Sequence, residues 1–176
     1  MATLYTIGHS TRALDELLAV LAAHGIRTLV DIRAFPASKR LPHFNRESLE
    51  AALPAAGIEY RWEPRLGGRR GKQRDDSPNT GLRNASFRNY GDYMLTAEFQ
   101  QGAAGVMQLA EQAPTAYMCA EKMYFQCHRM LVSDYFTAHG NTVLHIVDEH
   151  APREHTLTRE AHLVNGQLLY NAESLF

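Results

Sequence analysis

The sequence predicts an α/β fold, a single domain over residues 1–176 with three layers and a mostly parallel central sheet of about five strands. Short apolar runs alternate with helical segments along the chain, which is the order that βαβ units produce. The length of 176 residues, with 45% hydrophobic and 21% charged residues, also fits one globular domain with its own core.

Five short segments, mostly apolar or aromatic, are the expected strands of this sheet. They are Leu4–Ile7, Thr28–Ile32, Ile58–Trp62, Thr115–Met118 and Thr142–Val147. The second is interrupted only by Asp31, and nearly continuous apolar runs of this kind suit strands that are buried on both faces. Gln167–Tyr170 is expected to add a further strand or an edge contact.

Helical segments separate these strands. Leucines at helical spacing follow Ser10 and Thr11, and either of these two residues is expected to cap the first helix. Asn45 is expected to cap a second helix that runs to about Leu53. Three further helices are predicted over Phe87–Leu95, Ala97–Gln112 and Arg129–Ala138.

Composition narrows the class of protein. The net charge of -1 favours no nucleic-acid partner by itself, so such a partner has to be argued from local patches. The sequence shows no secretory leader and no apolar stretch long enough to cross a bilayer, so we expect a cytoplasmic protein without a membrane partner. Its two cysteines, Cys119 and Cys127, are then expected to be reduced.

Polar groups follow three of the predicted strands. These are Gly8-His9-Ser10, Asp31 with Arg33, and Cys119 with Glu121. Ligands of open parallel sheets bind at the carboxyl ends of the strands. We therefore expect these groups to face one crevice.

The segment Met118–Arg129 carries the strongest chemical signal. A thiol near a helix N-terminus and beside Arg or His⁺ has its thiolate favoured, and Cys127 precedes His128 and Arg129 at a predicted helix start. The first hypothesis is an enzyme with Cys119 or Cys127 as the nucleophile and with His128 or Glu121 as the proton-transfer group. Buried inert thiols are the competing interpretation.

The substrate of such an enzyme is expected to be a small anionic or nucleotide-like ligand. Arg33 and Arg129 are expected to bind its charge, because a guanidinium can hold an anionic group through two hydrogen bonds. A structural ion pair between Glu121 and Arg129 is the alternative. The sequence does not indicate the oligomeric state of the protein.

Known motifs exclude several sharper assignments. A phosphatase loop needs Arg six residues after its cysteine, and those positions hold Phe125 and Ser133. There is no C-x-x-C redox motif, no phosphate-binding loop and no dinucleotide fingerprint, so no cofactor is expected. A Cys/His metal site stays open as a weaker alternative, although the spacing of Cys119, Cys127 and His128 is not that of a zinc ribbon, and no metal ligand is assigned.

The stretch from Glu63 to Ala85 lacks periodicity and is rich in cations between Arg65 and Arg74. A loop of this length is usually functional or disordered. A second hypothesis is therefore a nucleic-acid or nucleotide-binding module, in which this basic loop contacts phosphates and the cysteines are structural.

Five motifs in order resemble those of the DUF488 family, a set of uncharacterised bacterial and archaeal proteins. They are T-I-G-H-S-T at Thr6–Thr11, V-D-I-R-A-F-P at Val30–Pro36, P-H-F-N at Pro42–Asn45, L-G-G-R-R at Leu66–Arg70, and M-C-A-E…C-H-R at Met118–Arg129. The resemblance covers nearly the full length. It implies an α/β fold and a site shared between these motifs, to which Arg69 and Arg70 are added as substrate-binding residues, but no reaction.

Overall fold

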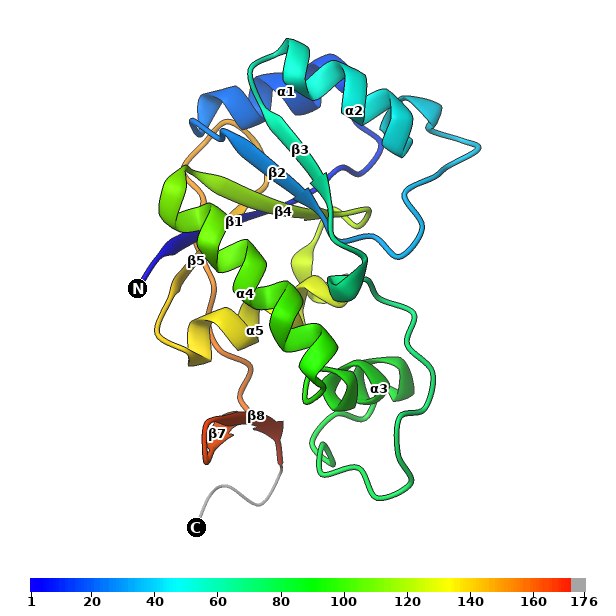
Figure 1. Ribbon diagram of the computed structural model, residues 1–176, viewed down its shortest axis with the longest axis vertical. Helices are drawn as coiled ribbons and strands as arrows, with labels where there is room; N and C mark the ends of the chain where they lie inside the picture. The colour runs from blue at the N-terminus through cyan, green and yellow to red at the C-terminus, as the bar shows by residue number, and fades with distance from the viewer. Residues whose placement is uncertain (172–176) are drawn as a thin grey trace.

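The computed structural model describes residues 1–171, and its centre is a six-stranded sheet (Figure 1). The strands are β1 (Thr3–Gly8), β2 (Thr28–Asp31), β3 (Glu59–Trp62), β4 (Thr115–Cys119), β5 (Thr142–Ile146) and β6 (Arg153–Glu154). Their order is β3-β2-β4-β1-β5-β6, with β1 to β5 parallel and β6 antiparallel to β5. The predicted α/β class with a mostly parallel sheet is therefore confirmed.

Five α-helices cover the two faces of the sheet. They are α1 (Leu14–Ala23), α2 (Arg46–Ala55), α3 (Ala85–Tyr93), α4 (Ala97–Gln112) and α5 (Arg129–Ala138). Apolar residues of α1 and α2 share one core cluster, and those of α3, α4 and α5 share the other. Successive side chains of β4 point to opposite faces of the sheet. Met118 therefore belongs to the first cluster, and Tyr117 and Cys119 belong to the second. No helix among residues 1–171 is long and apolar enough to cross a membrane.

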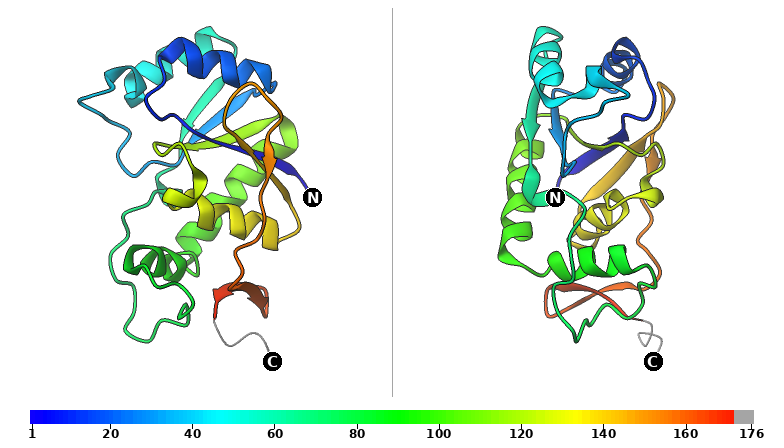
Figure 2. Two further views of the ribbon diagram at one scale, coloured as in Figure 1. Left: turned by 180° about the vertical axis from the view of Figure 1, so that it is seen from behind. Right: turned by 90° about the vertical axis from the view of Figure 1, so that its right-hand side faces the viewer.

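A small hairpin lies away from the main sheet (Figure 2), where Tyr170 forms hydrogen bonds with Asn79 and Gly81 in the segment before α3. It consists of β7 (Ala161–Val164) and β8 (Gln167–Tyr170), so the predicted strand at Gln167–Tyr170 is confirmed. Asn165 and Gly166 both have positive φ, which is the conformation that a tight two-residue hairpin turn requires. Tyr170 is fully buried, so the hairpin is packed onto the body of the protein.

The expected cap of the first helix is wrong. Ala13, not Ser10 or Thr11, is the N-cap residue of α1. Ser10 has a φ of 53°, and Arg12 donates hydrogen bonds to the carbonyls of Gly8 and Val147. These contacts hold the chain after β1 in a loop for several residues before the helix begins.

Strand order brings the predicted site loops together. β4 lies between β1 and β2, with Gly8 in register with Cys119 and Asp31 in register with Met118. Because all three strands are parallel, their carboxyl ends meet at one edge of the sheet. The loops after β1, β2 and β4 therefore share that edge.

Gly8 is the point of closest approach between two of these loops. A Cβ atom built on Gly8 would lie 1.7 Å from the carbonyl oxygen of Glu121, which is backbone and cannot rotate away. We predict that Gly8→Ala lowers the free energy of unfolding by about 3 kcal/mol, as strong overpacking does, in urea denaturation. Gly71→Ala is the matched control, since nothing lies within 4 Å of its added Cβ. Equal stability of the two variants would contradict this account.

Candidate functional site

A cavity of about 600 Å³ opens at the carboxyl edge of the sheet. It is lined by residues of the loops after β1, β2 and β4, together with Gly68, Arg69 and the start of α3. Eight of the predicted site residues line it: His9, Ser10, Arg33, Arg69, Cys119, Glu121, Cys127 and His128. Gly8, Asp31, Arg70 and Arg129 are outside its lining.

The two thiols are the centre of this cavity wall. Cys119 ends β4, and Cys127 follows the short 3-10 helix η3 (Tyr124–Gln126). Their sulfur atoms are 2.8 Å apart, and both cysteines are free. The backbone N–H of Arg129 donates to Cys127 Sγ at 3.3 Å, so Cys127 is an acceptor from the first turn of α5, and either thiol can donate to the other.

This geometry shifts the pKa values of the two thiols in opposite directions. Burial raises the pKa of Cys119, but the hydrogen bond from Cys127 and the positive charge of Arg129 lower it by more, from 9.0 to about 7. The same hydrogen bond, followed by burial, raises the pKa of Cys127. The first proton of the pair is therefore lost near neutral pH, and the second is held much more tightly.

Arg129 is 1% exposed, and its positive charge acts on both thiols. Its guanidinium donates to the carbonyl oxygens of Glu121 and Lys122 at 2.8 and 3.0 Å and to Thr6 Oγ1 at 3.0 Å. Among the described residues, its Nε has no hydrogen-bond partner. These contacts direct the guanidinium of Arg129 to acceptors within the protein, whereas the predicted substrate contact would require a side chain that lines the cavity.

A chain of buried hydrogen bonds leads away from Arg129. Thr6 Oγ1 contacts His145 Nδ1 at 2.6 Å, His145 Nε2 contacts His155 Nδ1 at 2.8 Å, and His155 Nε2 contacts Asp134 at 2.7 Å. One arrangement that completes the chain has Thr6 Oγ1 donate to a neutral His145, whose Nε2 donates to His155, which in turn donates from Nε2 to Asp134. Burial lowers the pKa of His145 to about 3, consistent with that neutral form.

Arg33 is held at the opposite wall of the cavity. It makes a buried ion pair with Asp31 at 2.6 Å, and Tyr60 Oη donates to the same carboxylate at 2.6 Å. Its guanidinium also donates to the Phe44 carbonyl at 2.7 Å. Since Asp31 neutralises Arg33, this pair contributes a rigid wall and little net positive charge.

Neither histidine of the cavity is placed as a simple base. His128 Nε2 contacts the Ile32 carbonyl at 3.0 Å, and its ring lies 5.1 Å from that of Tyr90. His9 Nδ1 contacts the Ser10 carbonyl at 2.8 Å. Burial lowers the pKa of each histidine to about 4, so both are neutral at pH 7.

The predicted arginines of the basic loop separate in space. Arg69 lines the cavity mouth, where its guanidinium lies 5.5 Å from the centre of the Phe35 ring. Arg70 instead stacks on Tyr93 at 3.9 Å and donates to the carbonyl oxygens of Gly67 and Pro64. Only Arg69 of the two faces the cavity.

Sequence reasoning missed two groups of residues. Phe35 and Phe87 line the cavity; Phe35 lies within one of the motifs that carry the family resemblance, so its position next to a strand end was the available signal, whereas Phe87 gave none. His145, His155 and Asp134 had no such signal. They meet Thr6 and one another only through tertiary contacts between segments far apart in the chain.

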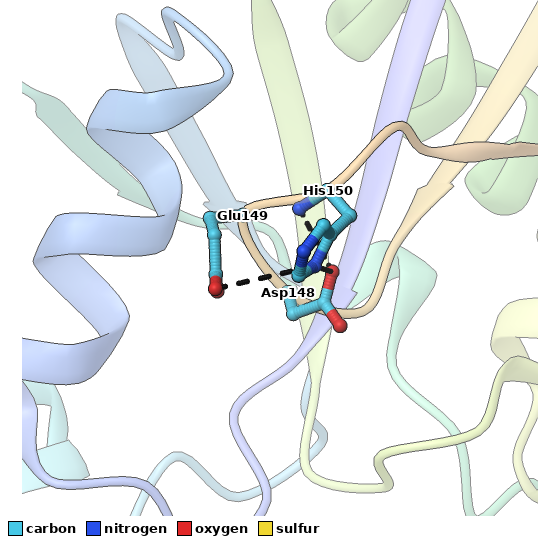
Figure 3. Close-up of side chains that lie close together, drawn as sticks. All are labelled: Asp148, Glu149 and His150. Carbon is cyan, nitrogen blue, oxygen red and sulfur yellow. Dashed lines mark hydrogen bonds and ion pairs between the residues drawn. The ribbon is translucent and has the colours of Figure 1, made fainter.

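Metal-ligating side chains gather elsewhere. Within residues 1–171, the only group of three that lies close enough to hold an ion is Asp148, Glu149 and His150, all exposed in the loop after β5 (Figure 3). His150 Nδ1 contacts Asp148 at 3.1 Å, so the cluster is satisfied internally. The thiols of Cys119 and Cys127 do not belong to it.

A family model described as "Domain of unknown function DUF488" matches residues 13–136, which is more than half of the chain and includes both thiols. The chain therefore belongs to the DUF488 family. No curated protein and no solved structure matches it.

The hydroxyl of Thr6 connects Arg129 to the histidine chain, which makes it a direct test of that link. We predict that Thr6→Val raises the pKa of Cys119 by about half to one unit, because the guanidinium loses a buried acceptor and its fixed position. Thr6→Ser, which keeps the hydroxyl, is expected to retain the original value. The pKa is read from the pH dependence of thiol alkylation, and an unchanged midpoint in Thr6→Val would contradict the link.

Proposed function

We propose that this DUF488 protein is a thiol-dependent enzyme that acts on a small anionic ligand in the cavity at the carboxyl ends of the strands. Cys119 is the nucleophile, and Cys127 holds the proton next to it. The observation that carries the proposal is the pair of sulfur atoms 2.8 Å apart in the cavity wall, with the charge of the buried Arg129 guanidinium acting on both.

A thiolate is favoured at Cys119 for two physical reasons. Cys127 donates its proton toward the Cys119 sulfur, and the charge of Arg129 acts through a buried, poorly screened environment. The thiolate is the reactive form of cysteine. Cys119 is only 2% exposed, so an electrophile reaches it from within the cavity and not from bulk water.

An anionic ligand is supported by the charges at the cavity mouth. Arg69 and Lys122 both line the cavity, and neither forms an ion pair with any described residue. Arg33 differs because Asp31 already neutralises it. The carboxylate of Glu121 also lines the cavity, so these two cations leave the lining with one positive charge in excess, which attracts a negatively charged ligand toward the reacting sulfur.

The second candidate function, a nucleic-acid or nucleotide-binding module built on the basic loop, has weaker support. Three of the cations in this loop make ion pairs with nearby acidic residues: Arg65 with Glu63, Lys72 with Asp75, and Arg74 with Asp76. Arg70 stacks on Tyr93. A surface of alternating, mutually paired charges attracts phosphates less than a continuous basic patch does.

Alkylation across pH tests the nucleophile. With iodoacetamide, we predict that Cys119 reacts with a midpoint near pH 7, about the pKa that its surroundings set, instead of the ~8.5 of a free thiol. Because only the thiolate reacts, the rate is half-maximal at the midpoint and levels off at higher pH. Peptide mapping identifies the modified cysteine.

Two substitutions of Cys127 provide the control. Cys127→Ala removes the hydrogen bond that favours the Cys119 thiolate and is expected to move the midpoint upward. Cys127→Ser keeps a donor and is expected to move it less. A midpoint at ~8.5 in the unaltered protein would rule out an activated thiolate at Cys119.

The charge preference of the cavity has its own test. We predict that Arg69→Gln lowers the alkylation rate with anionic iodoacetate more than with neutral iodoacetamide, by up to about fivefold at low salt, the effect of ~1 kcal/mol of lost attraction. Arg74→Gln removes the same charge outside the cavity lining and is the matched control. Equal effects of the two substitutions would argue against a specific anion site at the mouth.

A further inference from the structure

The surroundings of the thiol pair restrict the reactions open to a covalent intermediate on Cys119. Within the described residues, no side-chain hydrogen bond joins the carboxylate of Glu121 or the ring of His9 to either sulfur. His128 directs Nε2 to the Ile32 carbonyl, and its Nδ1 lies against Gly68, whose added Cβ would be 2.9 Å away. The site therefore offers no positioned base to activate water against such an intermediate.

The group that does contact Cys119 is a second nucleophile. Cys127 Sγ lies 2.8 Å from Cys119 Sγ, so a small movement of either side chain brings the pair to bonding distance. A covalent intermediate on Cys119 is then released by attack of Cys127 on the Cys119 sulfur. This release requires that the substrate fragment on Cys119 leaves with the bonding electron pair, as a thiolate does.

We propose that the cavity binds a small acidic disulfide and that Cys119 and Cys127 exchange electrons with it. This inference rests on the proposed function and names its substrate class and the role of the second thiol. Arg69 and Lys122 supply the contacts for the acidic groups of the ligand, and the apolar side chains of Phe35, Leu41 and Phe87 line the same cavity for its carbon atoms. A cavity of about 600 Å³ is of the size that takes such a ligand.

The first step forms a mixed disulfide. The Cys119 thiolate attacks one sulfur of the substrate, a bond forms between the two sulfurs, and the substrate S–S bond breaks. The departing thiolate carries away the bonding pair and takes the proton of Cys127. Cys127 is thereby left as a thiolate, and its negative charge is stabilised by the backbone N–H of Arg129 at the start of α5.

The second step closes the protein disulfide. The Cys127 thiolate attacks Cys119 Sγ, the Cys119–Cys127 bond forms, and the second half of the substrate leaves as a thiolate that takes a proton from water. In total, the two cysteines lose two electrons and the substrate disulfide becomes two thiols. Two molecules of a small thiol reverse both steps and return the dithiol form. Because Arg129 stabilises the thiolate, it favours the reduced pair in this exchange.

Oxidised glutathione, a disulfide that carries carboxylates, is the probe for this exchange. The reduced protein is mixed with an excess of it at pH 7 without air, quenched with N-ethylmaleimide and analysed by mass spectrometry. We expect the unaltered protein to form a Cys119–Cys127 cross-link without bound glutathione. Cys127→Ser is expected to accumulate a stable mixed disulfide on Cys119, and Cys127→Ala serves the same purpose if the serine variant does not fold.

A neutral disulfide tests the substrate class. Bis(2-hydroxyethyl) disulfide is expected to react more slowly than oxidised glutathione, and Arg69→Gln is expected to remove much of the difference, whereas Arg74→Gln is expected to keep it. An unchanged rate ratio in Arg69→Gln would overturn the assignment of acidic groups to the cavity mouth.

The failure of this inference can be distinguished from the failure of the proposed function. If Cys119 is alkylated with a midpoint near pH 7 but neither the cross-link nor the mixed disulfide forms, the disulfide substrate is wrong and the activated thiolate stands. If Cys119 has the ordinary thiol midpoint of ~8.5, the proposed function itself is wrong.

Discussion

The buried guanidinium of Arg129 is the constraint on which the site depends. A cation that is 1% exposed costs several kcal/mol in lost hydration unless fixed acceptors surround it. Two of its acceptors are the carbonyl oxygens of Glu121 and Lys122, in the loop that connects the cysteines. The same loop lies so close to Gly8 that a side chain there would collide with it. The guanidinium of Arg129 therefore fixes the position of this loop, and the loop keeps the two sulfur atoms in contact.

The opposite charge lies at the far end of the hydrogen-bonded histidines. Asp134 is fully buried on the same helix as Arg129, and it accepts from His155, from the Thr158 backbone and from Tyr170. The chain between the two charges crosses β1, β5 and the segment after β6. Residues beyond the end of the family match at 136 are therefore linked to the thiol site through Thr6 and Arg129. The hairpin that carries Tyr170 completes the buried polar network and does not belong to the main sheet.

Local patterns in the sequence are sufficient to predict the sheet and the edge at which the cavity opens. Apolar strands separated by helices predict βαβ order, and polar residues at strand ends predict that Cys119, His9 and Arg33 lie at one edge of the sheet, where all three line the cavity. The direction of Arg129 cannot be predicted in this way. A guanidinium near a helix start is equally compatible with a bound anion and with backbone acceptors, and only the fold of the Glu121–Lys122 loop decides between them. His145 and His155 cannot be predicted as part of the site for a related reason. Their roles depend on contacts with Thr6 and Asp134, which only the folded chain brings together.

Each of the two thiols has its own group that stabilises a negative charge. With the negative charge on Cys119, Cys127 acts as the donor, and Arg129 contributes its side-chain charge. With the charge on Cys127, the N–H at the start of α5 is already directed at that sulfur at 3.3 Å. The negative charge therefore has a stabilising group on either sulfur. Its transfer between them needs neither a histidine nor a carboxylate. That is the electrostatic requirement for two successive attacks by sulfur at one site, and a lone activated cysteine would meet only the first half of it.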